Sequence, residues 1–166
     1  MDKHYWKNAY KDFWDAAAAK EISIKNIIES ETGCEVMIVG MGAGGSAFVK
    51  GSAEDNKLAK GDADLFVTHK ECFIEVTGPN VRMDFDKPLW VRPDKLRNSY
   101  QKLMKGEGRL YVIVHVLSQP DNETAIRVVL LDQLFFDHLI HKKSFAKIHP
   151  VIRGRVETYY EIPPSA

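Results

Sequence analysis

Three strand-like segments stand between the first two helical segments of this 166-residue chain, and this order limits the folds open to it. The segments cover residues 35–39, 63–69 and 72–78, and each is rich in β-branched or aromatic side chains. Because only Lys70 and Glu71 separate the last two, we expect them to form a tight antiparallel hairpin. Strands that cluster in this way argue against repeated βαβ units and favour an α/β or mixed α+β sheet.

Helical signals lie on both sides of these strands. Residues 3–30 carry apolar side chains at spacings of three, four or seven, which predicts one long amphipathic helix that ends near Gly33. Glu21 lies close to the apolar stripe, where it either extends to water at the edge or serves a site, whereas Glu29 projects away. A second helix is predicted over 94–106. Beyond it we expect a hairpin of strands 109–117 and 124–131, a helix over 132–145 and a late edge strand over 157–162.

Composition excludes some classes of protein. Lys and Arg total 23, as do Asp and Glu, so no overall charge draws the protein to nucleic acid or to a membrane. The two cysteines, Cys34 and Cys72, lack C-x-x-C spacing, which argues against a disulfide framework or a zinc ribbon. The first residues lack the apolar core of a signal peptide, and no apolar run is long enough to span a bilayer. We therefore expect a cytoplasmic protein with no membrane partner, folded as a single domain over residues 1–166.

A glycine-rich loop, Gly40–Gly45, follows the first strand and matches G-x-G-x-x-G. A Rossmann fold requires a helix directly after these glycines, with its N-terminus at the pyrophosphate. Residues 46–51 are too short for that helix, contain Phe48 and Val49, and end in a glycine. The loop is better explained as a flexible turn in which glycine permits positive φ, and nucleotide binding by Gly40–Gly45 is the weaker alternative.

Acidic side chains gather on the predicted hairpin. Asp62 and Asp64 are two residues apart on an extended segment and share one side, and Glu75 and Thr77 share one face of the next strand. A turn at 70–71 would set Asp64 against Thr77, within reach of Glu75. Converging carboxylates repel unless they share a cation, so the cluster predicts Mg²⁺ or Mn²⁺ held by Asp64 and Glu75 with Asp62. The alternative is that Asp62 is a turn residue and that Glu75 and Thr77 line a solvent face.

This order of elements and these acidic positions resemble the PD-(D/E)xK nuclease superfamily, which includes Holliday junction resolvases and restriction endonucleases. The resemblance covers about residues 5–117 and implies an α/β, restriction endonuclease-like αβββαβ core, a mixed sheet flanked by helices. Residues 118–166 would add a strand, a helix and a tail to this nuclease-like domain. The resemblance implies that Asp64 is the motif aspartate and Glu75 the acidic residue of E-x-K, with Glu21 joining them from the first helix.

One departure from the family pattern concerns the lysine of E-x-K, which is Thr77 in this chain. Threonine cannot supply the positive charge that would contact the attacking water or the scissile phosphate. In some members of the superfamily the lysine comes from a neighbouring element, and the candidates for that role here are Lys60, Lys87 and Lys95.

The resemblance implies a metal-dependent nuclease that hydrolyses DNA phosphodiester bonds, with Mg²⁺-bound water as the nucleophile. Arg92, Lys95, Arg97 and Lys102 form the one local basic patch, which is either a contact for the nucleic-acid backbone or a solvated helix face. DNA is the expected partner, RNA could replace it, and a homodimer is suggested by analogy with resolvases. The alternative function is a catalytically inactive nuclease fold that binds nucleic acid or protein.

Overall fold

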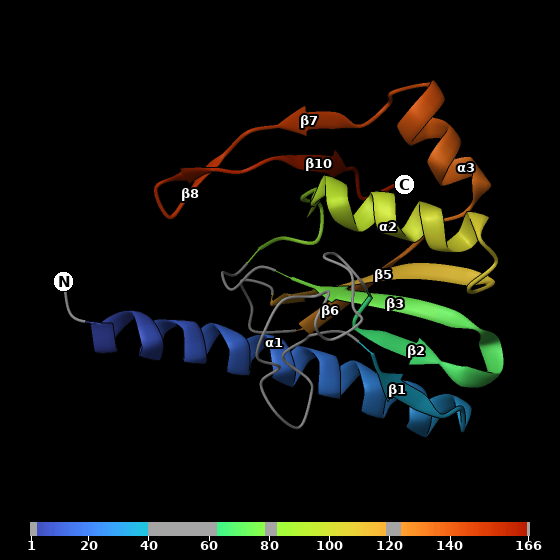
Figure 1. The fold of residues 1–166 in the computed structure, drawn as a ribbon, viewed down its shortest axis with the longest axis horizontal. Coiled ribbons are helices and arrows are strands. Elements are labelled where there is room, and N and C mark those ends of the chain that lie inside the picture. The colour runs from blue at the N-terminus through green and yellow to red at the C-terminus, as the bar shows by residue number, and fades with distance from the viewer. Residues whose placement is uncertain (1–2, 40–62, 79–82, 119–123, 166) are drawn as a thin grey trace.

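Two sheets and the helices packed on them make up most of the computed structural model, which describes residues 3–39, 63–78, 83–118 and 124–165, with side chains from residue 17 onward. The larger sheet has five strands in the order β1-β2-β3-β5-β6 (Figure 1). Of its neighbouring strands, β3 and β5 run parallel and the other pairs are antiparallel. The predicted mixed sheet flanked by helices is therefore confirmed. Its strands are β1 (Val36–Ile38), β2 (Leu65–Val67), β3 (Cys72–Thr77), β5 (Leu110–Ser118) and β6 (Thr124–Leu130).

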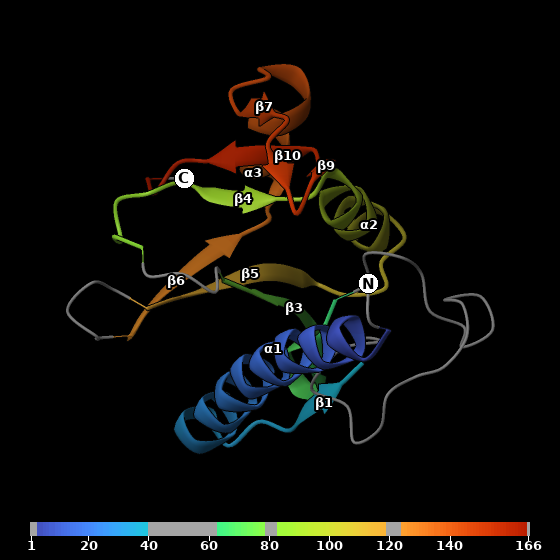
Figure 2. The ribbon, with the colours of Figure 1, turned by 90° about the vertical axis from the view of Figure 1, so that its left-hand side faces the viewer.

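The long helix α1 (Lys3–Thr32) covers one face of this sheet (Figures 1 and 2). The helix stops where the sequence predicts, because Gly33 adopts a φ of +67° and its N–H donates to the Glu29 carbonyl at 3.0 Å. Ile24 of α1 packs against apolar side chains from four strands of the sheet. These strand residues are Val36, Leu65, Val67, Cys72, Ile74 and Val114.

The opposite face of the sheet packs against α2 (Pro93–Met104), α3 (Gln133–Phe136) and the smaller sheet. As predicted, Pro93 begins α2, and Gly106 with a φ of +70° lies just beyond its end. Alternate residues of β5 divide between the two faces, since Ile113 belongs to this second core and Val114 to the core under α1. The second core contains Leu89, Leu96, Tyr111, Ile113, Val129, Leu131, Phe135, Phe136 and Ile162.

The smaller sheet corrects expectations about the C-terminal part of the chain. Its strand order is β4-β10-β7, so β10 (Tyr159–Ile162) is the central strand and not the edge strand predicted for residues 157–162. Neither β4 (Leu89–Val91) nor β7 (Ala146–Ile148) was predicted, because three residues are too few to show an alternation of their own. The predicted helix over 132–145 is also divided, since α3 continues as a π-helix, η2 (Asp137–His141).

A short hairpin connects β7 to β10. Its strands are β8 (Val151–Ile152) and β9 (Arg155–Val156), and it extends beyond the end of the small sheet (Figure 1). The two residues between them, Arg153 and Gly154, have φ values of 51° and 74°. Positive φ at both central residues is the geometry of a tight type I′ turn.

The hairpin of β2 and β3 has a different register from the predicted one. Leu65 pairs with Ile74, and residues 68–71 connect the strands in place of the predicted turn at 70–71. The 3₁₀ turn η1 (Thr68–Lys70) fills this connection, and Glu71 follows it with a φ of 50°. A shift of two residues keeps each side chain on its predicted face but changes its partner. Asp64, directly before β2, therefore lies beside residues 74–76 and not opposite Thr77, since its N–H donates to the Ile74 carbonyl and its Oδ2 accepts from the Val76 N–H.

Gly78, directly after β3, tests how closely β3 and β5 are packed. A Cβ atom on Gly78 would lie 2.1 Å from the backbone carbonyl oxygen of Val116, which cannot move without distorting β5. We expect Gly78→Ala to lower the free energy of unfolding by at least ~2 kcal/mol. Gly33→Ala is the control, because its Cβ would meet open space and the positive φ alone costs ~1 kcal/mol. Urea unfolding followed by circular dichroism measures both losses, and equal losses would contradict the packing described.

Candidate active site

Asp64 and Glu75 lie close together, Asp64 directly before β2 and Glu75 on β3. The backbone N–H of Asp64 donates to the Ile74 carbonyl at 3.0 Å, and the N–H of Val76 donates to Asp64 Oδ2 at 2.9 Å. These two bonds hold Asp64 against β3. Both acidic residues are buried, with 8% of Asp64 and 7% of Glu75 exposed. The charge of Asp64 acts on Glu75, so the two carboxyl groups are close enough to share one ligand.

A lysine from α2 reaches these carboxylates. Glu75 projects from the sheet face that carries its β5 neighbour Ile113, and α2 packs on that face. Lys95 is in the first turn of α2, and its Nζ lies 2.7 Å from Oε1 and 2.9 Å from Oε2 of Glu75. Pro93 begins the helix two residues earlier, which defines where Lys95 stands. The crossover from β3 to β5 thus places the ammonium group of Lys95 over the middle of the sheet.

Burial governs the ionisation of this site. Burial and the charge of Asp64 raise the pKa of Glu75 to about 8, against the opposing effect of Lys95. Burial also raises the pKa of Asp64, against the opposing effects of Lys95 and the Val76 N–H. Burial acts to lower the pKa of Lys95, but the charges of Glu75 and Asp64 outweigh it and the pKa of Lys95 is raised. Two buried carboxyl groups therefore face one partly buried lysine, and a proton or a further cation can neutralise the remaining charge.

The other two predicted acidic residues are Glu21 and Asp62. Glu21 of α1 is only 4% exposed, so it does not extend to water at the edge of the stripe, and its part in the site stays a prediction. Within the described ranges, no three His, Cys, Asp or Glu side chains are grouped so as to hold a metal ion. Asp62, the third predicted metal ligand, lies outside the described residues, as does the Gly40–Gly45 loop.

The three candidate replacements for the E-x-K lysine differ in their position relative to Glu75. Thr77 stands two residues beyond Glu75 on the same face, opposite His115 of β5. Lys95 contacts Glu75, as described above. Lys87 is exposed and supplies its backbone carbonyl to Arg127, whose Nη1 donates to it at 2.9 Å. Lys60 lies outside the described residues.

The four residues of the predicted basic patch occupy different environments. Arg92, next to the start of α2, forms an ion pair with Asp94, and its charge also acts on Glu75. Arg92 therefore stands close to the carboxylates together with Lys95.

The remaining two residues of the patch lie elsewhere on α2. Lys102 Nζ is 3.4 Å from Glu107 Oε2 and 4.9 Å from the centroid of the Phe73 ring. Arg97 lines a separate pocket on the other side of the helix. The four residues of the predicted patch therefore do not form one continuous basic surface over α2.

Sequence reasoning missed a row of polar side chains beside the carboxylates. Strand pairing places Thr77, His115 and Arg127 side by side across β3, β5 and β6. Burial and the charges of Arg127 and Lys20 together lower the pKa of His115 to about 4, so this histidine is neutral at pH 7. Lys20 of α1 donates to the carbonyl of Gly78 at 3.1 Å, at the end of β3. Only the pairing of distant strands reveals this row, so no local sequence signal could have predicted it.

Comparisons of the chain with protein-family models, with curated proteins and with solved structures found no match. The function must therefore be argued from the geometry of the site. In the described part of the chain, no helix has both the length and the hydropathy needed to cross a membrane.

The donor set of this site fits a hard divalent cation. Carboxylate oxygens are the ligands that Mg²⁺ and Mn²⁺ prefer, and protein Mg²⁺ sites commonly use one or two carboxylates with waters completing the shell. Lys95 competes for the Glu75 oxygens that such a cation would need. Because ligands must be deprotonated to bind a metal, the raised pKa values of Asp64 and Glu75 link cation binding to proton release.

The raised pKa of Glu75 makes the stability of the metal-free protein depend on pH. The folded state keeps a proton that the unfolded state releases near pH 4.5, so stability is lost as pH rises toward about 8. His115 acts in the opposite direction, since its pKa is lowered from 6.5 to about 4, but that effect is complete near pH 6.5. Between about pH 6.5 and 8 we therefore expect the free energy of unfolding to fall by ~2 kcal/mol.

Chemical denaturation at the two ends of this interval measures the slope. Glu75→Gln resembles the protonated side chain and cannot titrate, so it should remove most of the slope while keeping the fold. A wild-type stability that rises between these pH values would contradict the ionisation assigned to Glu75.

Proposed function

We propose that this protein is a metal-dependent nuclease that hydrolyses DNA phosphodiester bonds, with Asp64 and Glu75 as the ligands of Mg²⁺ or Mn²⁺ and Lys95 as the catalytic lysine. The observation that carries the proposal is the contact of Lys95 Nζ with both carboxylate oxygens of Glu75, at 2.7 and 2.9 Å, beside the buried Asp64. An aspartate, a glutamate and a lysine are the side chains that a PD-(D/E)xK site requires.

The order of elements supports the same proposal. The chain runs through α1, three antiparallel strands, the short strand β4 of the smaller sheet, α2 and then β5, which lies parallel to β3. Apart from β4, this order resembles the αβββαβ order of a restriction endonuclease-like core, in which the second and third strands carry the acidic residues. Thr77 leaves the E-x-K position without a cation, and Lys95 of α2 takes its place.

The residues of the site divide the work of the reaction. Asp64 and Glu75 hold the cation, which when bound lowers the pKa of a water molecule and neutralises the charge that develops on the phosphate. Lys95 can then turn its ammonium from Glu75 to a phosphate oxygen or to the attacking water. Burial of the two carboxylates and partial burial of Lys95 strengthen these interactions, because little water screens them.

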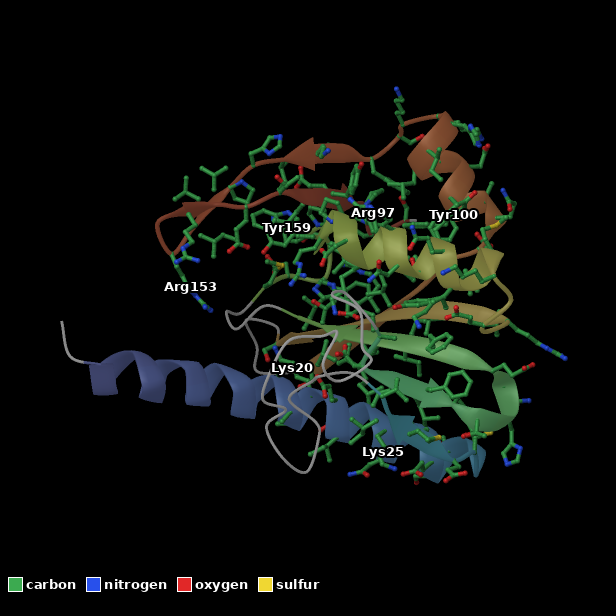
Figure 3. All side chains as sticks on the ribbon, viewed as in Figure 1. Lys20, Lys25, Arg97, Tyr100, Arg153 and Tyr159 are labelled. Atoms are coloured by element: carbon green, nitrogen blue, oxygen red, sulfur yellow. The ribbon has the colours of Figure 1, made fainter. Side chains whose placement is uncertain are left out.

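Cations close to the carboxylates favour an anionic polymer as the substrate. The charge of Arg92 acts on both Glu75 and Tyr159, and the charge of Arg153 also acts on Tyr159. Arg153 lies at the tip of the β8–β9 hairpin, with Tyr159 between it and α2 (Figure 3). Since the net charge is zero, binding must come from local cations, and this line from Lys95 to the hairpin suits a DNA backbone.

The predictions of an RNA partner and of a homodimer do not depend on the geometry of this site. RNA has the same phosphate backbone and stays an alternative substrate. A homodimer stays a prediction from the resemblance to resolvases.

A binding module without catalysis is the second candidate, and Thr77 is the observation that favours it. A nuclease that had lost its catalytic lysine would carry another residue, such as this threonine, at the motif position. Arg92 and Arg153 could still bind the phosphate backbone of a nucleic acid. Nucleotide binding by Gly40–Gly45 gains no support, because that loop lies outside the described residues.

Cleavage assays on plasmid, linear and branched DNA with Mg²⁺ or Mn²⁺ separate the two candidates. We expect Asp64→Ala, Glu75→Ala and Lys95→Ala each to lower the cleavage rate at least ~100-fold, because each removes a group that acts on the transition state. Lys105→Ala is the matched control, since this exposed lysine lies just past the end of the same helix and contacts neither carboxylate.

The pattern across these variants decides the outcome. Full cleavage by Lys95→Ala would reject the catalytic role of Lys95. Wild-type protein that binds DNA but never cleaves it would favour the binding module. RNA in the same assay determines whether the activity is restricted to DNA.

Proton release on metal binding is a second test of the same site. The test is calorimetric titration with Mg²⁺ at pH 7 in buffers of different ionisation enthalpy. Because Glu75 has a pKa of about 8 and is mostly protonated at pH 7, we expect release of ~1 proton per ion bound. The affinity for Mg²⁺ should rise with pH, and Glu75→Gln should lose both effects. Binding without proton release at pH 7 would place the cation elsewhere.

A further inference from the structure

A pocket of about 530 Å³ lies on the side of α2 that faces away from the carboxylates. Pro93, Arg97 and Tyr100 line it from α2, and their spacings of four and three put them on one face of the helix, opposite Lys95. Figure 3 shows Arg97 and Tyr100 along α2, and the other walls come from α3, η2, β7 and β10. Its volume is that of a site for a small organic molecule.

The rim of this pocket is positively charged. Arg97, Lys143 and Lys147 line it, and no aspartate or glutamate is among its described lining residues. In the part of the chain that the structure describes, Arg97 and Lys143 form no ion pair, whereas the adjacent Lys142 lies 3.2 Å from Asp137 Oδ2. Three cations without a local acid favour an anionic ligand.

The floor of the pocket is aromatic. Tyr100 and Phe136 meet edge to face with ring centroids 5.0 Å apart. Tyr160 pairs with Lys147 across β10 and β7, and the Lys147 ammonium lies 5.7 Å from the Tyr160 ring centroid. A ligand that satisfies both features has a flat apolar body against the rings and a negative charge at the rim.

The backbone presents Lys143 to this pocket in a defined conformation. Its φ of 51° lies in the left-handed region, which lysine rarely adopts. The N–H of Ser144 donates to the His138 carbonyl at 2.9 Å, and Ser144 Oγ lies 3.1 Å from His138 Nδ1, so the turn after η2 is fixed. A π-helix followed by a residue with positive φ is a costly arrangement that recurs at ligand sites.

We propose that this pocket binds a nucleoside monophosphate unit, with the base against Tyr100 and Tyr160 and the phosphate among Arg97, Lys143 and Lys147. A phosphate dianion suits a pocket lined by three cations, and a nucleic-acid base of any kind can stack on aromatic side chains. The unit is either a free nucleotide or the 5′-terminal nucleotide of a DNA strand, since both present the same groups. The pocket uses no atom of Asp64 or Glu75 and does not depend on the proposed nuclease activity.

Titration of the wild-type protein with AMP, adenosine and inorganic phosphate at low ionic strength tests the two halves of the site. We expect saturable AMP binding at least ~10-fold tighter than that of either fragment, because only AMP fills both the floor and the rim. AMP that binds no tighter than phosphate would overturn the proposal.

Three variants locate that binding. Lys143→Gly removes the ammonium while suiting the positive φ, so the fold is kept, and Arg97→Ala removes a second cation. We expect each to weaken AMP binding at least ~10-fold, as loss of a charged hydrogen bond does. Lys142→Ala is the matched control and should leave AMP binding unchanged. Equal affinity in Lys143→Gly, Arg97→Ala and wild type would overturn the proposal.

Two further arms identify the source of the ligand and separate this pocket from the carboxylates. Binding of a short single-stranded oligonucleotide that requires its 5′-phosphate and is lost in Lys143→Gly identifies a strand end, whereas binding of AMP alone identifies a free nucleotide. Asp64→Ala should bind AMP as the wild type does, even if it has lost cleavage. Loss of AMP binding in Asp64→Ala would place the ligand at the carboxylates and overturn the proposal.

Discussion

The ion pair between Lys95 and Glu75 is the interaction on which the rest of the site depends. Its contacts of 2.7 and 2.9 Å join the first turn of α2 to β3 and, once Glu75 has lost its proton, neutralise one of two buried carboxylates. Removing one partner of a buried pair costs about 3–5 kcal/mol, so the position of α2 and the ionisation of the site are set together. The parallel pairing of β3 with β5 makes the contact possible, because it requires a crossover that carries α2 across the sheet.

The helix α2 separates two sites of opposite charge. One face presents Lys95 to Asp64 and Glu75, where carboxyl groups outnumber the lysine. The other face presents Arg97 to a pocket that no described acidic residue lines. The ligand proposed for the first site is a divalent cation and that for the second an anion, which are the two components that phosphodiester chemistry brings together. A single helix can hold both because residues two apart in sequence point to opposite sides.

Local signals in the sequence predicted much of the fold. The end of α1 at Gly33 and the start of α2 at Pro93 follow from glycine, proline and apolar periodicity, and so do the faces of Asp64 and Glu75. The mixed sheet was implied by the resemblance to nucleases. The register of β2 and β3 could not be predicted, because Glu71 closes the turn with a positive φ that glutamate does not signal. The strands β4 and β7 gain their stability only by pairing with β10. Lys95 was one of three candidates, since its role depends on a contact with Glu75 twenty residues away.

Anomalous diffraction from crystals grown with Mn²⁺ is the most direct test of the central claim, because it locates the cation independently of activity. We predict an anomalous peak from Mn²⁺ between Asp64 and Glu75, with their carboxylate oxygens at about 2.1–2.2 Å from the ion and Lys95 Nζ moved away from Glu75. At saturating Mn²⁺ and a pH above 8, an intact ion pair of Lys95 and Glu75 with no peak between the carboxylates would contradict it. That result would make the buried pair a structural link between α2 and β3 and nothing more.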